Sequence, residues 1–150
     1  MLNSVKKMWV FVDPDTCGEL VDELVVGIER RGWQTDRFPV NMPSVRTKEV
    51  PKVVMTLLTK PVCFSDAISQ LFERLTKQGV PIAVWYIGDQ AEHIKLPEGT
   101  SITLCLFSDE ATKNAWAKAN TGFATVIKGV DSALASIIRK VSPDGVEMAN

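Results

Sequence analysis

The sequence predicts an α/β domain, because apolar runs of strand length alternate with stretches that have the period of a helix. The clearest case is residues 50–88, where VPKVVMTLLT, a capped loop, an amphipathic helix and VPIAVWYIG follow one another. That order is the order of a βαβ unit. The apolar runs are continuous rather than alternating, which is typical of parallel strands covered by helices on both faces. We therefore expect a three-layer sandwich with a central parallel sheet of five strands.

The first half of the chain supplies three of these strands. MWVFVD (8–13) is the first strand, and a cap at Asp15 or Thr16 begins a helix that ends at Gly32. Residues 33–40 form a more polar strand near the sheet edge, because Pro39 cannot donate to a ladder. Residues 41–51 are expected to be a loop, and the third strand follows.

The second half continues the alternation. A helix that starts after Ser65 carries apolar residues at i, i+3, i+4 and i+7 and stops at Gly79, before the fourth strand. A polar loop leads to the fifth strand, SITLCLF, and Ser108 with Asp109 caps a short helix. Residues 123–129 are either a short sixth strand or an extended connection. A last helix begins at Asp131, and the chain is one domain, 1–150, with a frayed tail at 143–150.

Central-strand residues and tryptophans are assigned to packing. The residues expected to be almost inaccessible are Val54, Leu57, Ile82, Val84, Leu104 and Leu106. The four tryptophans are assigned to core or half-buried positions, namely Trp9, Trp33, Trp85 and Trp116.

Composition excludes several functional classes. The chain has 150 residues, 45% of them hydrophobic and 23% charged, with a formal net charge of -1. Nucleic-acid binding would need a cluster of excess Lys and Arg, so no nucleic-acid partner is expected. No run of eighteen apolar residues exists, and the short N-terminal apolar run does not fit a signal peptide, so we expect a cytoplasmic protein without a membrane span.

Polar side chains gather where the predicted strands end. With a flavodoxin-like strand order, ligands bind at the carboxyl ends of the strands, where the order reverses. The segments at that edge are VDPD, TKPVCFSD, IGD and FSDE. The ligand-binding candidates are therefore Asp13, Asp15, Thr59, Cys63 and Asp89.

Two interpretations of this acidic rim remain open. Carboxylates suit Mg²⁺, but Asp and Ser also cap helices, which explains Ser65, Asp66, Ser108, Asp109 and Asp131. Asp13 precedes the expected cap, so it is the best acidic candidate for a site. No phosphate-binding glycine motif is present, and no metal-ligand set is predicted.

The cysteines and the one histidine give no motif. Cys17, Cys63 and Cys105 are far apart, without the spacing of a zinc site or a redox pair. The assumed strand order brings Cys17 and Cys63 together, where a helix N-terminus would lower a thiol pKa, although two unrelated cysteines are the simpler interpretation. His93 would have to reach one of them to act in catalysis.

The segment VVMTLLTKPVCFSDAISQLFERLTKQGVPIAVWYIG resembles the centre of a TIR domain. A Ser- or Thr-containing turn, a Ser-initiated helix and a strand that begins with Val-Pro carry the resemblance. It implies the TIR fold and, for the members that cleave NAD, a glutamate in that helix. Six residues after Ser65 this chain has Leu71, and Glu73 is the nearest acid. The catalytic candidates are therefore Glu73 and Ser65.

A second resemblance is to response-regulator receivers. Asp13 and Asp15 after the first strand, VPIAVWYIG, and the final IKGVDSALASIIRKV carry it. Receivers place a phosphoacceptor aspartate at the end of the third strand, and this chain has Thr59 there. The resemblance therefore implies a receiver-shaped domain without the usual phosphotransfer.

Three functional hypotheses follow. The first is a non-enzymatic signalling or interaction module that binds a nucleotide-derived small molecule at the carboxyl ends of the strands, with a protein partner or a second copy as its partner. The second is NAD or nucleoside glycosidic-bond hydrolysis with Glu73, Asp13 and Ser65 around the pocket. The third is a degenerate receiver. No cofactor is assigned, and NAD and Mg²⁺ are the two that these hypotheses would use.

Overall fold

A computed structural model describes residues 6–13, 18–41, 50–59, 64–87, 99–100, 104–119, 124–127 and 129–141. Within these ranges it contains six strands and four helices. The strands are β1 (Lys7–Val12), β2 (Gln34–Pro39), β3 (Val53–Leu58), β4 (Ile82–Tyr86), β5 (Leu104–Phe107) and β6 (Ala124–Val126). The helices are α1 (Gly18–Arg30), α2 (Asp66–Lys77), α3 (Glu110–Ala119) and α4 (Val130–Val141).

All the described strands lie in one parallel sheet with the order β2-β1-β3-β4-β5-β6. The order reverses between β1 and β3, because the chain first moves from β1 to β2 and then returns to the other side of β1. The expected parallel α/β sandwich with a flavodoxin-like order is confirmed. The sheet has one strand more than the five expected, since residues 124–126 pair with β5 through Cys105 and Ala124.

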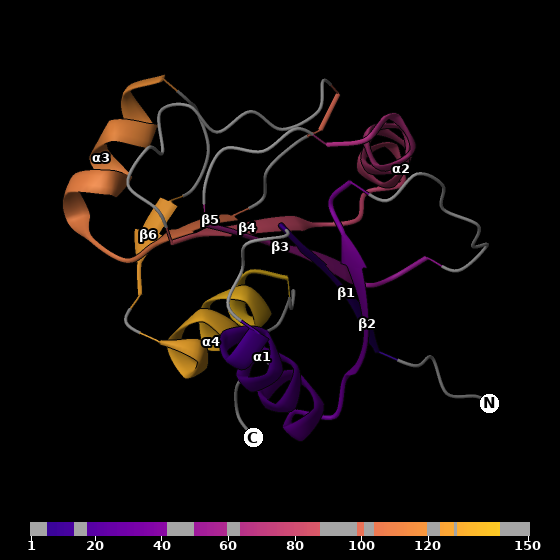
Figure 1. Ribbon diagram of the computed structural model, residues 1–150, viewed down its shortest axis with the longest axis horizontal. Coiled ribbons are helices and arrows are strands. Elements are labelled where there is room, and N and C mark those ends of the chain that lie inside the picture. Colours follow the sequence, from indigo (N-terminus) through magenta and orange to yellow (C-terminus); the bar gives the residue numbers. More distant parts are fainter. Residues whose placement is uncertain are drawn as a thin grey trace.

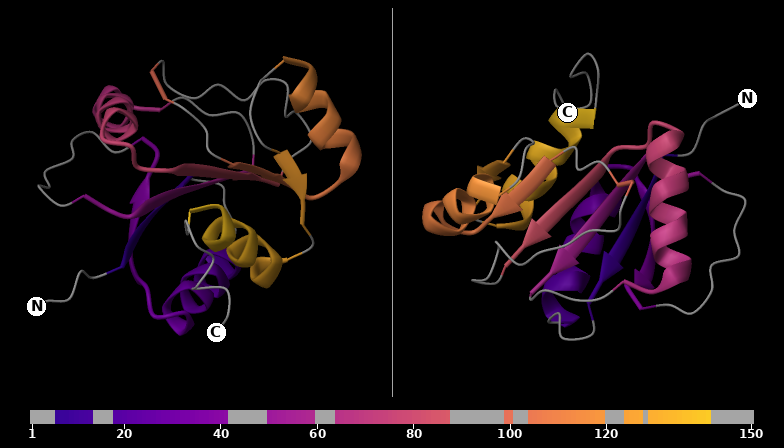
Figure 2. Two further views of the ribbon diagram at one scale, coloured as in Figure 1. Left: turned by 180° about the vertical axis from the view of Figure 1, so that it is seen from behind. Right: turned by 90° about the horizontal axis from the view of Figure 1, so that it is seen from above.

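Two helices cover each face of the sheet (Figure 1). α1 and α4 lie on one face, and α2 and α3 lie on the other. This arrangement follows from the strand order, because parallel crossovers are right-handed. The crossover through α1 runs in one direction along the sheet, whereas those through α2 and α3 run in the opposite direction, so they pack on opposite faces (Figure 2).

The sheet separates two hydrophobic clusters, and alternate residues of each strand point into one or the other. On β3, Met55 faces α1 and α4, whereas Val54 faces α2. The expected core residues are all buried, namely Val54, Leu57, Ile82, Val84, Leu104 and Leu106. The four tryptophans are buried as well, which confirms that they pack the core. No helix in the described ranges has both the length and the apolar character that a membrane span requires.

Helix ends follow the expected capping chemistry in two cases and differ in a third. The Ile68 N–H donates to Ser65 Oγ at 3.2 Å at the start of α2. The Thr112 N–H donates to Asp109 Oδ1 at 2.7 Å at the start of α3, and this hydrogen bond lowers the pKa of Asp109. The sequence predicts Asp131 as a cap, but α4 begins at Val130, so Asp131 lies in its first turn.

The hydroxyl of Thr56 is an exception to the apolar core. Thr56 lies in the middle of β3, is fully buried, and shares its face of the strand with Val54 and Leu58. Its Oγ1 has no hydrogen-bond partner among the described residues. A buried hydroxyl without a partner costs free energy, because it loses its bonds to water on folding.

Thr56→Val is therefore expected to stabilise the fold by roughly 1–3 kcal/mol, since valine keeps the shape and removes the unpaired hydroxyl. The matched control is Val54→Thr, which adds a hydroxyl two residues earlier on the same face and should destabilise the protein. Both free energies of unfolding can be measured by urea titration. A Thr56→Val variant that is less stable than the parent would show that this hydroxyl is hydrogen-bonded.

Candidate functional site

The carboxyl ends of β1 and β3 lie side by side where the strand order reverses. Asp13 directly follows β1, and Thr59 directly follows β3. The Thr59 N–H donates to Asp13 Oδ2 at 2.6 Å, and the Thr59 hydroxyl donates to the same oxygen at 3.0 Å. Both residues are ligand-binding candidates from the sequence, and they are in direct contact in the structure.

This contact gives Asp13 a structural role. Asp13 is only 2% exposed, so its carboxylate needs donors from the protein. Hydrogen bonds to an ionised acceptor are about twice as strong as neutral ones. The Asp13 N–H also donates to the Leu57 carbonyl at 3.4 Å. Backbone and side chain of Asp13 together fasten the end of β1 to the end of β3.

The remaining candidates at this edge divide into two groups. Ser65 lies at the start of α2, and its hydroxyl accepts the capping hydrogen bond described above. The other ligand-binding candidates lie outside the described residues, namely Asp15, Cys63 and Asp89. Cys17 and His93 also lie outside them.

Leu71 and Glu73 lie on different sides of the α2 helix. Leu71 is buried against the sheet, whereas the Glu73 side chain is 49% exposed and lies 3.8 Å from the Lys77 ammonium. Two residues on a helix differ by about 200° in direction, which explains the contrast. Glu73 also lies about 10 Å along the helix from its first residue, Asp66, and therefore away from the carboxyl edge.

The Glu73 carboxylate lies beside Gly99. A Cβ at Gly99 would lie 3.0 Å from Glu73 Oε2, so the Glu73 side chain would have to move slightly to admit a side chain there. The φ of Gly99 is +81°, a conformation that side chains disfavour. Glu73 thus packs beside the chain that precedes β5.

Metal and thiol chemistry gain no support from the described part of the chain. Within it, no three His, Cys, Asp or Glu side chains come close enough together to hold a metal ion. Cys105 points into the cluster beneath α2 and α3, and burial raises the pKa of its thiol to about 12. Cys105 is therefore a neutral thiol at physiological pH and a poor nucleophile.

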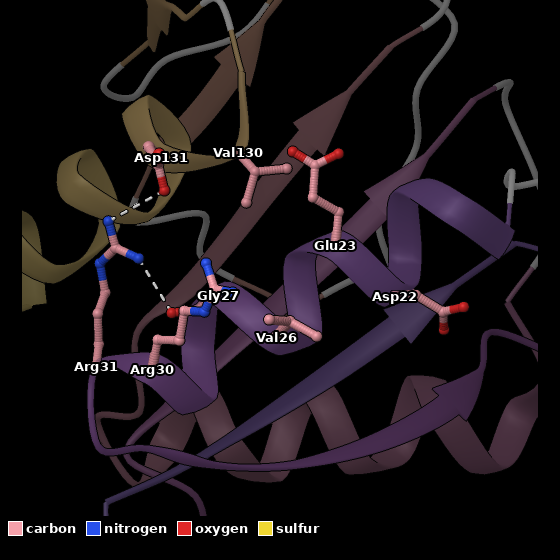
Figure 3. Close-up of a pocket in the computed structure, with 8 residues that line it drawn as sticks. All are labelled: Asp22, Glu23, Val26, Gly27, Arg30, Arg31, Val130 and Asp131. Carbon is pink, nitrogen blue, oxygen red and sulfur yellow. Dashed lines mark hydrogen bonds and ion pairs between the residues drawn. The ribbon is translucent and has the colours of Figure 1, made fainter.

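A second feature, which sequence reasoning missed, is a groove of about 350 Å³ between α1 and α4. Figure 3 shows its residues. Glu23, Val26 and Arg30 come from α1, and Val130 comes from α4. The sequence signal was the polar face of α1, but its pairing with α4 depends on the fold of the whole chain.

Gly27 sets the spacing of the two helices at this groove. A Cβ at Gly27 would lie 2.8 Å from Leu134 Cδ1 and 3.3 Å from Val130 Cγ1. The groove is closed at one end by Arg31, whose Nη1 donates to the Gly27 carbonyl at 3.0 Å. Arg31 Nη2 lies 3.5 Å from Asp131 Oδ1 (Figure 3). The close approach therefore requires glycine, and Arg31 joins the two helices.

Comparisons of this chain with protein-family models, curated proteins and solved structures gave no match.

Asp13→Asn is expected to lower the free energy of unfolding by about 1–3 kcal/mol, because the carboxylate is buried and accepts the Thr59 hydrogen bonds. Thr59→Val and the double variant complete a cycle, in which the two changes should not be additive. Urea unfolding measures all three, and Asp66→Asn, an exposed acid in the first turn of α2, is the control. A fully stable Asp13→Asn protein would contradict the structural role.

Gly27→Ala is expected to leave the protein about 1–3 kcal/mol less stable than Gly18→Ala does, because only the first adds a methyl group against Leu134 and Val130. A Cβ at Gly18 meets nothing within 4 Å. Gly27 lies in the interior of α1, where alanine gains about 1 kcal/mol in helix propensity, whereas Gly18 is the first residue of the helix and gains less, so the difference is a lower limit on the cost of the contact with α4. Equal stabilities in thermal and urea unfolding would mean that the two helices can move apart without cost.

Proposed function

We propose that this protein is a signalling or interaction module that acts by binding rather than by catalysis. The contact between Asp13 and Thr59 is the observation that carries the proposal. The best acidic candidate at the reversal of strand order already accepts two hydrogen bonds from Thr59 and is almost inaccessible to solvent. A catalytic or metal-binding carboxylate needs free lone pairs directed at its substrate or ion.

The α2 helix supports the same proposal. Cleavage of a glycosidic bond develops positive charge on the ribose, and a carboxylate that stabilises this charge must face the bound sugar. The position that the TIR resemblance assigns to the glutamate is Leu71, which packs in the core. Glu73 faces outward beside Lys77 and Gly99. Neither Leu71 nor Glu73 therefore offers a carboxylate at the carboxyl edge for this step.

A small-molecule ligand at the carboxyl edge is the second part of the proposal. In doubly wound sheets the crossovers on either side of the reversal diverge to opposite faces, which leaves a crevice above the strand ends. In this chain those crossovers contain α1 and α2. A nucleotide-derived ligand fits the TIR-like resemblance, and its binding needs no catalytic carboxylate.

The proposal predicts that nucleotides or NAD raise the melting temperature without being consumed. A ligand at about one hundred times its Kd stabilises the folded state by about 2.7 kcal/mol. The measurement combines a thermal-shift screen of nucleotides and NAD with an assay of nicotinamide release. Glu73→Ala should have no effect on either result, because Glu73 lies away from the carboxyl edge.

NAD turnover by the parent protein that disappears in Glu73→Ala would overturn the proposal and establish the hydrolase hypothesis. Thr59→Val changes the contact with Asp13 and leaves α2 intact, so it distinguishes an effect at the carboxyl edge from an effect at Glu73. Turnover that persists in Glu73→Ala would also overturn the proposal and would place the catalytic group elsewhere in the chain.

A further inference from the structure

The outward side of α1 carries charges of opposite sign on either side of an exposed apolar residue. Val26 is 45% exposed, which is unusual for a large hydrophobic side chain in the described part of this protein. Glu23 lies one turn before Val26, and Arg30 lies one turn after it. All three line the groove between α1 and α4 (Figure 3).

The neighbouring charges are already paired within the chain. Asp22 lies 3.0 Å from the Arg37 guanidinium, and Arg31 contacts Asp131 and the Gly27 carbonyl. Among the residues that the structure describes, neither Glu23 nor Arg30 has an ion-pair partner, and both are exposed. The two charges that border Val26 are therefore available for contacts with another molecule.

We propose that this side of α1 packs against the same side of α1 in a second copy of the chain, with the two helices antiparallel. The position midway between Glu23 and Arg30 lies between Val26 and Gly27. A two-fold axis there places Glu23 of each copy opposite Arg30 of the other, because each residue lies about 5 Å along the helix from the axis. The contact is isologous, so both ion pairs form at once.

Charge complementarity favours a second copy as the occupant. A surface with Glu at one end and Arg at the other matches itself after a half-turn, whereas a partner of uniform charge would be repelled at one end. Val26 supplies the exposed apolar centre, whereas Val130 is buried in the core, and the two charges flank Val26 as a polar rim flanks an apolar core. This inference names a partner for the proposed interaction module and rests on that proposal.

The test is sedimentation equilibrium of the full chain over a concentration series, with three charge variants. Glu23→Arg and Arg30→Glu each replace two attractions by two repulsions, so each should weaken the self-association by about tenfold or more. The double variant, which exchanges the two charges, should restore it. An equimolar mixture of the two single variants should form a mixed pair, because one copy then carries only Arg and the other only Glu at these positions.

Arg74→Glu is the matched control. Arg74 lies in the last turn of α2, as Arg30 lies in the last turn of α1, so both changes disturb the helix dipole alike. α2 lies on the other face of the sheet from α1 and α4, so Arg74→Glu should leave the association unchanged. Circular dichroism verifies that each variant is folded, and added salt should weaken the parent pair.

A parent protein that is monomeric at every concentration would overturn the inference, as would a pair that survives both single charge reversals. Single variants that fail to associate when mixed would also overturn it. These outcomes are separate from those of the proposed function. A charge-dependent dimer that consumes NAD would refute the binding-only proposal and keep the interface, whereas a monomer that binds without turnover would do the reverse.

Discussion

The need to bury both faces of a parallel sheet determines most of this structure. β3 and β4 are buried along their whole length, so helices must cover them on both sides. Right-handed crossovers place α1 on one face and α2 and α3 on the other, which leaves the face beside α1 for α4. The contact between α1 and α4, the glycine at residue 27 and the groove above it all follow from this constraint.

The same constraint explains the behaviour of Asp13. A strand buried on both faces ends in a buried position, and a carboxylate there must find donors within the protein. The adjacent parallel strand ends at the same level, so its next residue, Thr59, offers an N–H and a hydroxyl. The geometry of the two strand ends thus gives a structural reason for an acid after the first strand.

The sequence predicts features whose cause is local, and it misses those that depend on distant pairing. Continuous apolar runs and a 3.6-residue period predict the strands, the α2 helix and its Ser65 cap. The sequence leaves residues 123–129 as either a short sixth strand or an extended connection, and the structure has a strand of three partly buried residues there. A glycine such as Gly27 weakens an isolated helix. Its role is to leave room for Leu134, which is more than a hundred residues away in the sequence and packs against it in the fold. The groove could not be predicted for the same reason.

The two proposed surfaces are geometrically independent. α1 follows β1, so it begins at the carboxyl edge of the sheet and runs back toward the amino edge. An axis near the middle of α1 makes the helices of the pair antiparallel and directs the two carboxyl edges away from each other. The proposed pairing therefore leaves the carboxyl edge of each copy uncovered. α1 connects the two proposed surfaces, because its first turn lies at the carboxyl edge and its centre lies at the proposed axis.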